Sequence, residues 1–168
     1  MADAFYTTGL AELNSGVVNW VADEIRVGLV SAMAYKFNAA HLFADALGTG
    51  LLGFGTLVNR TSVGGIVGST GTTTITAALS QQTAHALVTY KWSVALATSR
   101  LLSYHDSVIG LPAAPDGGPF TLVVPHGTNR LFDYVTQQFG VWEGLRGSFQ
   151  SAIVTPPCEG SVSRSMAF

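Results

Sequence analysis

The sequence predicts a mainly β protein whose core is an antiparallel β-sandwich or barrel, with one or two short helices and a C-terminal arm. Residues 87–96 alternate between apolar and polar or small side chains, and residues 24–30 do so more regularly still. Alternation with this period gives a strand one apolar face. Glycine- and proline-rich clusters separate the short apolar runs. Such spacing is typical of strands joined by turns.

The first expected element is a short helix over Ala4–Asn14. Its apolar side chains recur close to helical spacing, and Asp3 stands before them as the expected N-cap. Ser15-Gly16 then supplies the stop, because glycine tolerates the left-handed conformation that ends many helices.

A strand over residues 24–30 follows, with its odd-numbered side chains expected to point inward. Residues 35–47 contain a second, short helical signal. The chain then becomes rich in glycine, and we expect one strand near residues 55–60 followed by a loop up to Gly71. Residues 72–78 form a threonine-rich strand by the same reasoning.

The centre of the expected fold is a hairpin over Ala86–Leu111, with a break at residues 97–100. Valine, tyrosine and tryptophan recur in it, and these residues favour pleated, half-buried surfaces. The cluster of prolines and glycines at residues 111–119 predicts an irregular surface loop. A last pair of strands is expected at residues 120–124 and 130–135, joined by a turn.

Position 136 divides the expected β-rich core domain, residues 1–136, from a C-terminal extension, residues 137–168. Large apolar side chains continue beyond this point, among glycines and serines. Two interpretations stay open: these residues complete the core as one more strand or helix, or they form an arm that packs on a neighbouring subunit. For the arm, the expected partner-binding residues are Phe139, Trp142, Leu145 and Phe149.

The composition favours a protein that is partly covered by other subunits. Hydrophobic residues make up 48% of the chain and charged residues 11%, against about 25% charged in an average soluble domain. A free monomer with so few charges lacks a major source of solubility, so we expect a homo-oligomer, a trimer being one arrangement. The alternative is a soluble protein rich in serine, threonine and glycine.

Charge and hydropathy also exclude several classes of partner. The net charge is −2 and no basic stripe is present, so no nucleic-acid partner is expected. No apolar run reaches about 18 residues, so no membrane span is expected. The N-terminus lacks the pattern of a signal peptide. Cys158 is the single cysteine, which excludes an internal disulfide and suits a reducing cytoplasm.

No motif in the sequence predicts catalysis, a cofactor or a metal. Gly48, Gly50 and Gly53 match the spacing of a dinucleotide fingerprint, but that motif must follow a strand and open a helix. No two of the four histidines have metal-ligand spacing. His105 and Asp106 are adjacent, so on a strand they point to opposite faces and cannot form a catalytic pair. We therefore expect a protein that is not an enzyme and binds no cofactor or metal.

Several short patterns occur together along the chain. A helix ending in glycine leads to Trp20 and an I-x-V-x-L-V strand; a hairpin containing a tryptophan leads to Y-x-D; and an extended strand, a glycine turn and an aromatic strand close the pattern. The matched positions are Gly9–Ser31, Tyr35, His41, Asp45, Trp92, Tyr104, Asp106 and residues 120–135. This layout resembles a family of small structural virion proteins of tailed bacteriophages, of the capsid decoration or cement type. The resemblance spans roughly Phe5–Val135 and departs at residues 48–71 and after Thr136.

The resemblance implies a structural virion component, made in the host cytoplasm, that stabilises the shell by bridging copies of the major capsid protein. A first alternative is a structural protein of the tail or the head–tail connector. A second is a carbohydrate-binding module for host attachment that uses Trp92, Tyr104 or Tyr134, since aromatic rings with a polar edge serve such sites.

Overall fold

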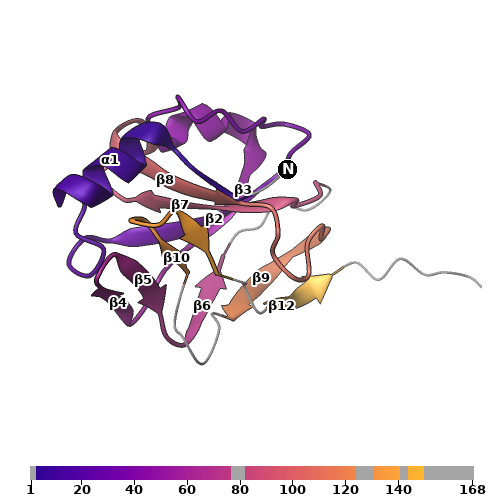
Figure 1. The fold of residues 1–168 in the computed structure, drawn as a ribbon. Helices are drawn as coiled ribbons and strands as arrows, with labels where there is room; N and C mark the ends of the chain where they lie inside the picture. Colours follow the sequence, from indigo (N-terminus) through magenta and orange to yellow (C-terminus); the bar gives the residue numbers. More distant parts are fainter. Residues whose placement is uncertain (1–2, 77–81, 124–130, 141–143, 150–168) are drawn as a thin grey trace, which may run out of the picture.

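The computed structural model describes residues 3–76, 82–123, 131–140 and 144–149, and it is mainly β as the sequence predicts. A five-stranded antiparallel sheet forms the middle of the molecule, in the order β1-β8-β7-β2-β3. A four-stranded sheet, β11-β10-β5-β4, and a three-stranded sheet, β12-β9-β6, lie below it (Figure 1). The helix α1 and the 3-10 helix η1 lie above it.

The elements in chain order have the following bounds. They are β1 Ala4–Phe5, α1 Thr7–Ser15, β2 Ile25–Val30, η1 Ala44–Gly50, β3 Leu51–Thr56, β4 Arg60–Val63, β5 Ile66–Ser69, β6 Thr72–Ile75, β7 Ala86–Lys91, η2 Leu96–Thr98, β8 Arg100–His105, β9 Pro115–Val123, β10 Phe132–Asp133, β11 Gln138–Phe139 and β12 Gly144–Phe149.

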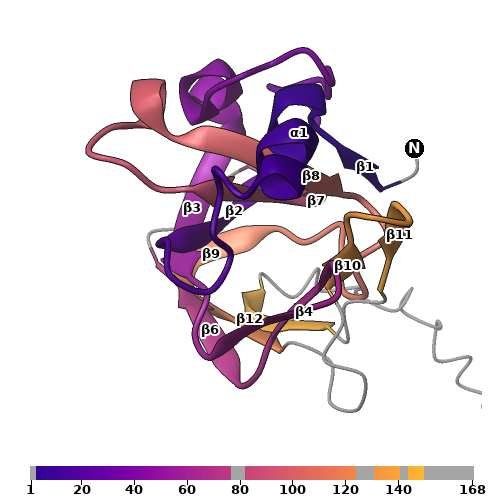
Figure 2. The ribbon, with the colours of Figure 1, turned by 60° about the vertical axis from the view of Figure 1, so that its left-hand side comes forward.

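The five-stranded sheet is buried on both faces. Its lower face joins the two smaller sheets in one core, which includes Val27, Leu87 and Phe132. Its upper face carries a second core that includes Val88 and Tyr90. Figure 2 shows the layers from the side, with α1 above β8 and β7 and with β4, β6 and β12 below. The arrangement is a sandwich with an added helical layer.

The central hairpin and the strand over residues 24–30 are confirmed. β7 and β8 pair antiparallel, and Ala86 to Lys91 of β7 pair with Val30 to Ile25 of β2. The expected single apolar face of the first hairpin strand is wrong, because both faces of this sheet are covered. Leu87 and Thr89 are as fully buried as Val88 and Tyr90.

The N-terminal helix begins later than the sequence predicts. Ala4 and Phe5 form β1, which pairs with Tyr104 and Ser103 of β8, and α1 begins at Thr7. Asp3 is therefore not the N-cap: its carboxylate accepts hydrogen bonds from the backbone N–H groups of Asp106 and Ser107, at 3.0 and 3.1 Å. Gly16 ends the helix with φ 76°, as the sequence predicts.

The glycine-rich region holds more strand than expected. The second helical signal yields only η1, over Ala44–Gly50. The strand expected at residues 55–60 is β3, over Leu51–Thr56, and the expected loop contains the hairpin β4–β5. Gly64 and Gly65 form its turn with φ of 59° and 88°. Two successive positive φ values define the tight hairpin turn that glycine pairs favour.

Two expectations in the second half of the chain are wrong. β9 begins at Pro115, inside the segment predicted as an irregular loop. The strands predicted at residues 120–124 and 130–135 do not pair with each other in the described part of the chain. Instead β9 lies between β12 and β6, and β10 lies between β11 and β5.

Replacing Gly9 by alanine is expected to lower the free energy of unfolding by about 1–3 kcal/mol, as overpacking of a filled interior does. A Cβ atom at position 9 would lie 2.2 Å from the backbone oxygen of Leu101, so α1 would have to move off β8. Urea denaturation measures the change. Asn14→Ala, at an exposed position of the same helix, is the control and should shift stability by less than about 0.5 kcal/mol. Equal effects of both substitutions would contradict the close packing of α1 on β8.

Candidate functional site

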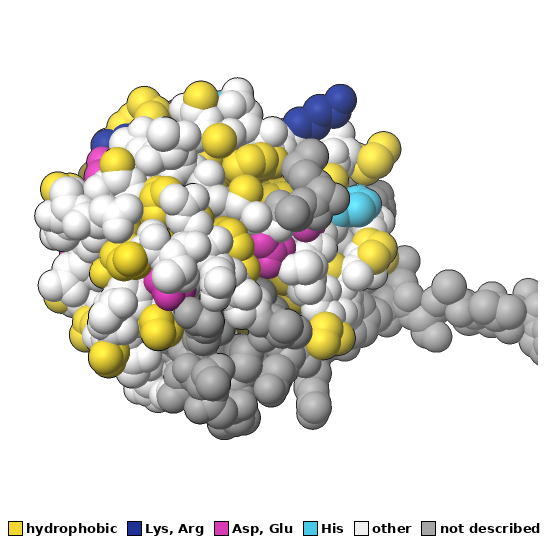
Figure 3. Space-filling model, viewed as in Figure 1, with side chains coloured by type: hydrophobic (Ala, Val, Ile, Leu, Met, Phe, Trp, Pro, Cys, Tyr) yellow, Lys and Arg dark blue, Asp and Glu magenta, His cyan; other side chains and the backbone are white. Residues whose placement is uncertain are grey.

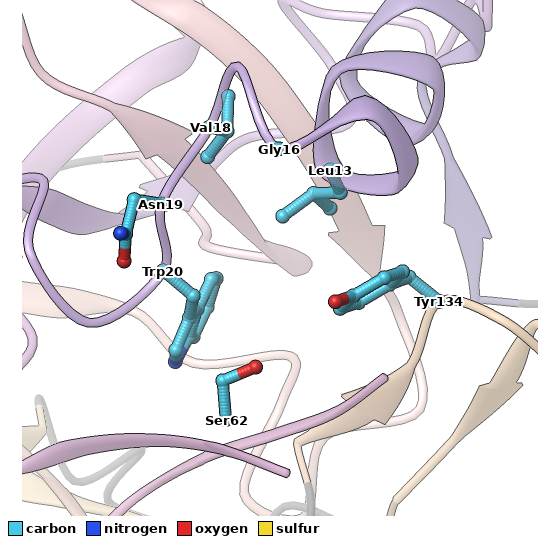
Figure 4. Close-up of a pocket in the computed structure, with 7 residues that line it drawn as sticks. All are labelled: Leu13, Gly16, Val18, Asn19, Trp20, Ser62 and Tyr134. Atoms are coloured by element: carbon cyan, nitrogen blue, oxygen red, sulfur yellow. The ribbon is translucent and has the colours of Figure 1, made fainter. Parts of the chain in front are cut away.

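A small hollow between α1 and β4 is the candidate site of the molecule. It has a volume of about 180 Å³ and is lined by Leu13, Gly16, Val18, Asn19, Trp20, Ser62 and Tyr134. Figure 4 shows Leu13, Trp20, Ser62 and Tyr134 around the hollow, with the Tyr134 hydroxyl directed into it. The lining carries no formal charge. Leu13, Val18 and Trp20 are buried and form its apolar floor.

The segment that follows α1 is held in place by its own polar groups. The Asn19 side-chain oxygen accepts hydrogen bonds from the N–H groups of Val21 and Ala22, at 3.1 and 3.0 Å. The Asn19 N–H donates to the Asp23 carboxylate at 2.8 Å. Trp20 donates its ring N–H to the backbone oxygen of Gly68 in β5, at 2.9 Å. The floor of the hollow is therefore fixed to the sheet that carries β4.

Four exposed valines are sequence neighbours of residues that line the hollow, and we call them the valine rim; Val63 lies on the face of β4 opposite to Ser62. They are Val17, Val21, Val63 and Val135, with exposed fractions of 49–77%. Each one is adjacent in the sequence to a residue that lines the hollow. Hydrophobic side chains are visible over the β4–β5 region, and few charged ones appear on this face (Figure 3). Exposed apolar side chains gathered on one face of a soluble protein mark an interaction surface.

The cations next to the valine rim are already engaged. The Arg60 guanidinium donates to the backbone oxygens of Trp20 and Val21, at 2.8 and 3.0 Å. Lys91 lies 2.8 Å from the Asp23 carboxylate. The Arg60 charge is thus held by backbone oxygens and the Lys91 charge is paired with a carboxylate, while the hollow itself offers the hydroxyls of Ser62 and Tyr134 above an apolar floor.

A second polar feature lies deep in the first core. Ser103 and His105 are two residues apart on β8 and so share a face; the Ser103 hydroxyl lies 2.8 Å from His105 Nε2. Thr89 bonds to Ser103 from the other side, and the Asp3 carboxylate lies 3.6 Å from His105 Nδ1. With a neutral ring, Ser103 donates to Nε2 while Nδ1–H points at Asp3. We call these four residues the buried network.

The buried network resembles a serine–histidine–aspartate triad but has no access to a substrate. Ser103 and His105 are fully buried, and the His105 ring packs on Phe132 and Phe139 with centroid distances of 6.1 and 5.3 Å. A nucleophile must reach its substrate, so these groups serve the fold. Sequence analysis considered only the neighbouring carboxylate of Asp106 and so missed the buried network, because the carboxylate that faces His105 belongs to Asp3.

The pKa values of the buried network shift in directions that its surroundings explain. Burial lowers the pKa of His105, against the opposing influence of Asp3 and Asp106. Burial alone would raise the pKa of the Asp3 carboxyl, but hydrogen bonds with His105 and Ser107 outweigh it and lower that pKa to about 2.

The structure places the four sequence-predicted partner residues on strands or outside its described part. Phe139 lies in β11, and its ring packs against Phe5 with a centroid distance of 4.6 Å. Leu145 and Phe149 lie in β12, which pairs with β9; Trp142 lies outside the described residues. Strands from both sides of position 136 thus share sheets, as in the interpretation that this stretch completes the core. Partner binding by these residues stays a prediction.

The three aromatic residues considered for sugar binding do not form one platform. Trp92 is stacked by the Arg26 guanidinium, 3.7 Å from its ring centroid. Tyr104 is buried in the second core, on the upper face of the central sheet. Tyr134 packs against the first core, on the opposite face, and lines the hollow.

The remaining motifs have structural explanations. Gly48 and Gly50 lie in η1 and Gly53 lies in β3, so a short helix precedes a strand, the reverse of the order that a dinucleotide fingerprint requires. His41 Nδ1 is hydrogen-bonded to Tyr35 at 3.0 Å.

Within the described ranges, no three His, Cys, Asp or Glu side chains are grouped so that they could hold a metal ion. None of the helices described is long and apolar enough to cross a membrane.

No protein-family model, no curated protein and no solved structure matches this chain.

Sequence reasoning missed Ser62 and Val63, because the glycines around them predicted a loop. One signal was available: Gly64-Gly65 between Val63 and Ile66 is the two-residue turn that joins adjacent strands. Placing Tyr134 and the segment after α1 beside that hairpin required the tertiary structure.

Proposed function

We propose that this chain is a structural component of a tailed-phage virion, a capsid decoration protein that stabilises the shell by binding the major capsid protein and copies of itself. The observation that carries the proposal is the uncharged hollow together with the exposed side chains of the valine rim. Binding energy at protein interfaces concentrates where an apolar side chain fills such a pocket and surrounding contacts exclude water.

The proposed mechanism is burial of apolar surface across the joints between capsid subunits. A standard interface buries about 1,200–2,000 Å² in total, and repetition over a shell multiplies a modest contribution from each copy. The low charge of the chain, 11% Asp, Glu, Lys and Arg, suits a surface that is covered in the assembly. The proposal that this assembly is a phage capsid comes from the sequence resemblance to structural virion proteins.

Quantitative mass spectrometry of purified particles tests the proposal, with the major capsid protein as the reference. A ratio near one-to-one or one-to-three supports a decoration protein. A ratio of a few per cent instead favours the tail or head–tail connector. Absence of the chain from the particles overturns the virion proposal.

Introducing charge on the valine rim is expected to weaken binding to particles at least tenfold. Val63→Glu combined with Val135→Glu places two carboxylates where the proposed interface excludes water, and an uncompensated buried charge is strongly unfavourable. Co-sedimentation with particles that lack the chain measures binding. Both positions are exposed, so the fold should persist in circular dichroism.

Met33→Glu is the control for this experiment. Met33 is 87% exposed and follows β2 at the end opposite to Ile25, away from the valine rim. It should retain wild-type binding. Equal binding by the rim variant and the control would remove the rim from the interface.

A further inference from the structure

We propose that β4 accepts residues 151–155 of a second copy of this chain as an added strand, with one side chain of that segment filling the hollow. This inference rests on the proposed function, since it describes how copies associate with one another. It identifies the hollow and the valine rim as the acceptor half of a self-association contact.

The acceptor is an open sheet edge. Among the described residues β4 is the terminal strand of its sheet, with β5 on its other side. Thr61, Ser62 and Val63 are all exposed. Natural proteins protect such edges with lysine, proline or inward-pointing charge. Arg60 is the only charged residue of β4, and its guanidinium is bound to backbone oxygens of the segment after α1 and of Leu57.

The hollow lies where an added strand would place a side chain. Side chains alternate along a strand, so Arg60 and Ser62 share one face of β4. Arg60 binds the segment that follows α1, and Ser62 lines the hollow, so this face is directed toward the hollow. Directly opposed residues on neighbouring strands project to the same side. The residue that pairs with Ser62 would therefore project over the hollow.

The hollow has room for one side chain of aliphatic or ring size, which would meet an apolar floor and the hydroxyls of Ser62 and Tyr134. Its volume of about 180 Å³ is slightly larger than the cavity of about 150 Å³ that holds a benzene molecule in a protein interior. Its floor is apolar and its walls are uncharged. Strand addition gains affinity from main-chain hydrogen bonds and specificity from pockets for alternate side chains. Here the edge of β4 supplies the main-chain hydrogen-bonding groups, and the hollow supplies a side-chain pocket.

The sequence after β12 provides a matching strand. Residues 151–155 read Ser-Ala-Ile-Val-Thr, with three consecutive β-branched residues and no charge, and Pro156 and Pro157 follow. β-branched residues favour strands, and proline ends them. This segment lies outside the described residues and begins two positions after Phe149, the last residue of β12.

Chain length favours donation to a second copy. β12 and β4 lie on opposite sides of the molecule (Figure 1). Because extended chain spans at most about 3.6 Å per residue, the six residues after Phe149 reach at most about 22 Å from it. The acceptor edge lies across the molecule from β12, so donation to a second copy is favoured over donation within one chain.

Disulfide trapping between two different variants tests the inference. Cys158→Ser makes the full-length chain free of cysteine, since it holds only one. In that background one protein carries Ser62→Cys and the other carries a single cysteine at one of positions 151–155. Equimolar mixtures are oxidised and analysed by intact mass. We expect a mixed disulfide dimer with at least one donor position, at least fivefold above the mixture in which Met33→Cys replaces Ser62→Cys.

The outcomes separate cleanly. No mixed dimer above the control at any of the five positions overturns the inference. A chain carrying both cysteines that yields only internal disulfide also overturns it, because the segment then adds to its own chain. Either failure leaves the particle measurement unaffected, so a chain found at high copy number without trapping would retain the proposed function and lose this mode of self-association.

Discussion

Replacing Phe132 by alanine is expected to lower the free energy of unfolding by about 3–5 kcal/mol, as truncation of a fully buried aromatic residue does. Its ring contacts Phe5 from β1 and Trp20 from the segment after α1, with centroid distances of 5.0 and 5.1 Å in edge-to-face geometry. It also stacks on His105 of β8. The phenyl ring therefore joins a short strand of the lower layer to three separate parts of the chain.

Urea or thermal denaturation followed by tryptophan fluorescence measures this loss, because Trp20 is itself a contact of the ring. Val135→Ala is the matched control: it removes an apolar side chain three residues away that is 62% exposed, and it should change stability by less than about 0.5 kcal/mol. A loss below about 1 kcal/mol for Phe132→Ala would mean that the core between the sheets closes around the missing ring.

The elements that the sequence predicted best are those whose signal is local. β2, β7 and β8 alternate strongly, and their pairing follows from a hairpin and an adjacent strand. The end of α1 is also local, because Gly16 alone sets it. The signal for the start of α1 is not local, because residues 4 and 5 form the strand β1 only through their pairing with β8.

Three sheet pairings of the lower layer, β10 with β5 and β9 with β6 and β12, depend on contacts that no local pattern encodes. Phe132 pairs with Val67 on one side and with Phe139 on the other, so β10 joins strands from two distant parts of the chain. The large apolar side chains after Thr136 were equally consistent with a core strand and with an arm that packs on a neighbouring subunit. Hydrophobicity alone does not distinguish a side chain buried in its own chain from one buried in a partner.

The candidate site likewise combines features that local sequence predicts with contacts that only the tertiary structure reveals. Its individual parts have sequence signals: a glycine stop after α1, a tryptophan anchor and a Gly-Gly turn. Their convergence has no such signal, because Trp20 bonds to Gly68 across 48 positions of sequence and Tyr134 follows β10. A residue such as Ser62 acquires its significance only from this convergence.

The buried network is expected to make the fold sensitive to acid, beginning below about pH 6.5, the ordinary pKa of histidine. Burial lowers the pKa of His105 in the folded chain. As the pH falls, the unfolded chain therefore takes up a proton at this residue before the folded chain does, and the free energy of unfolding decreases. One such proton contributes a slope of up to about 1.4 kcal/mol per pH unit.

Asp3 adds a second loss at lower pH. Its pKa is lowered to about 2 in the fold, so its contribution to stability is complete above about pH 4, its ordinary range. That contribution disappears as the pH falls toward 2. Both shifts thus act in the same direction, with His105 titrating first. Asp106, the other carboxylate acting on His105, favours the protonated ring as Asp3 does and so limits the loss.

His105→Gln isolates the histidine, because glutamine keeps hydrogen-bonding capacity and does not titrate. Urea unfolding at pH 7.5, 6.5, 5.5 and 4.5 should give a smaller slope of stability against pH for this variant than for the wild type. Val88→Ala, a buried truncation in the other core, should lower stability by a similar amount at every pH and leave the slope unchanged. If all three proteins share one slope, His105 is as free to take up a proton in the folded chain as in the unfolded one. The strand β1 would then be held by its pairing with β8 and by the bonds of Asp3 to residues 106 and 107, with no contribution from the histidine.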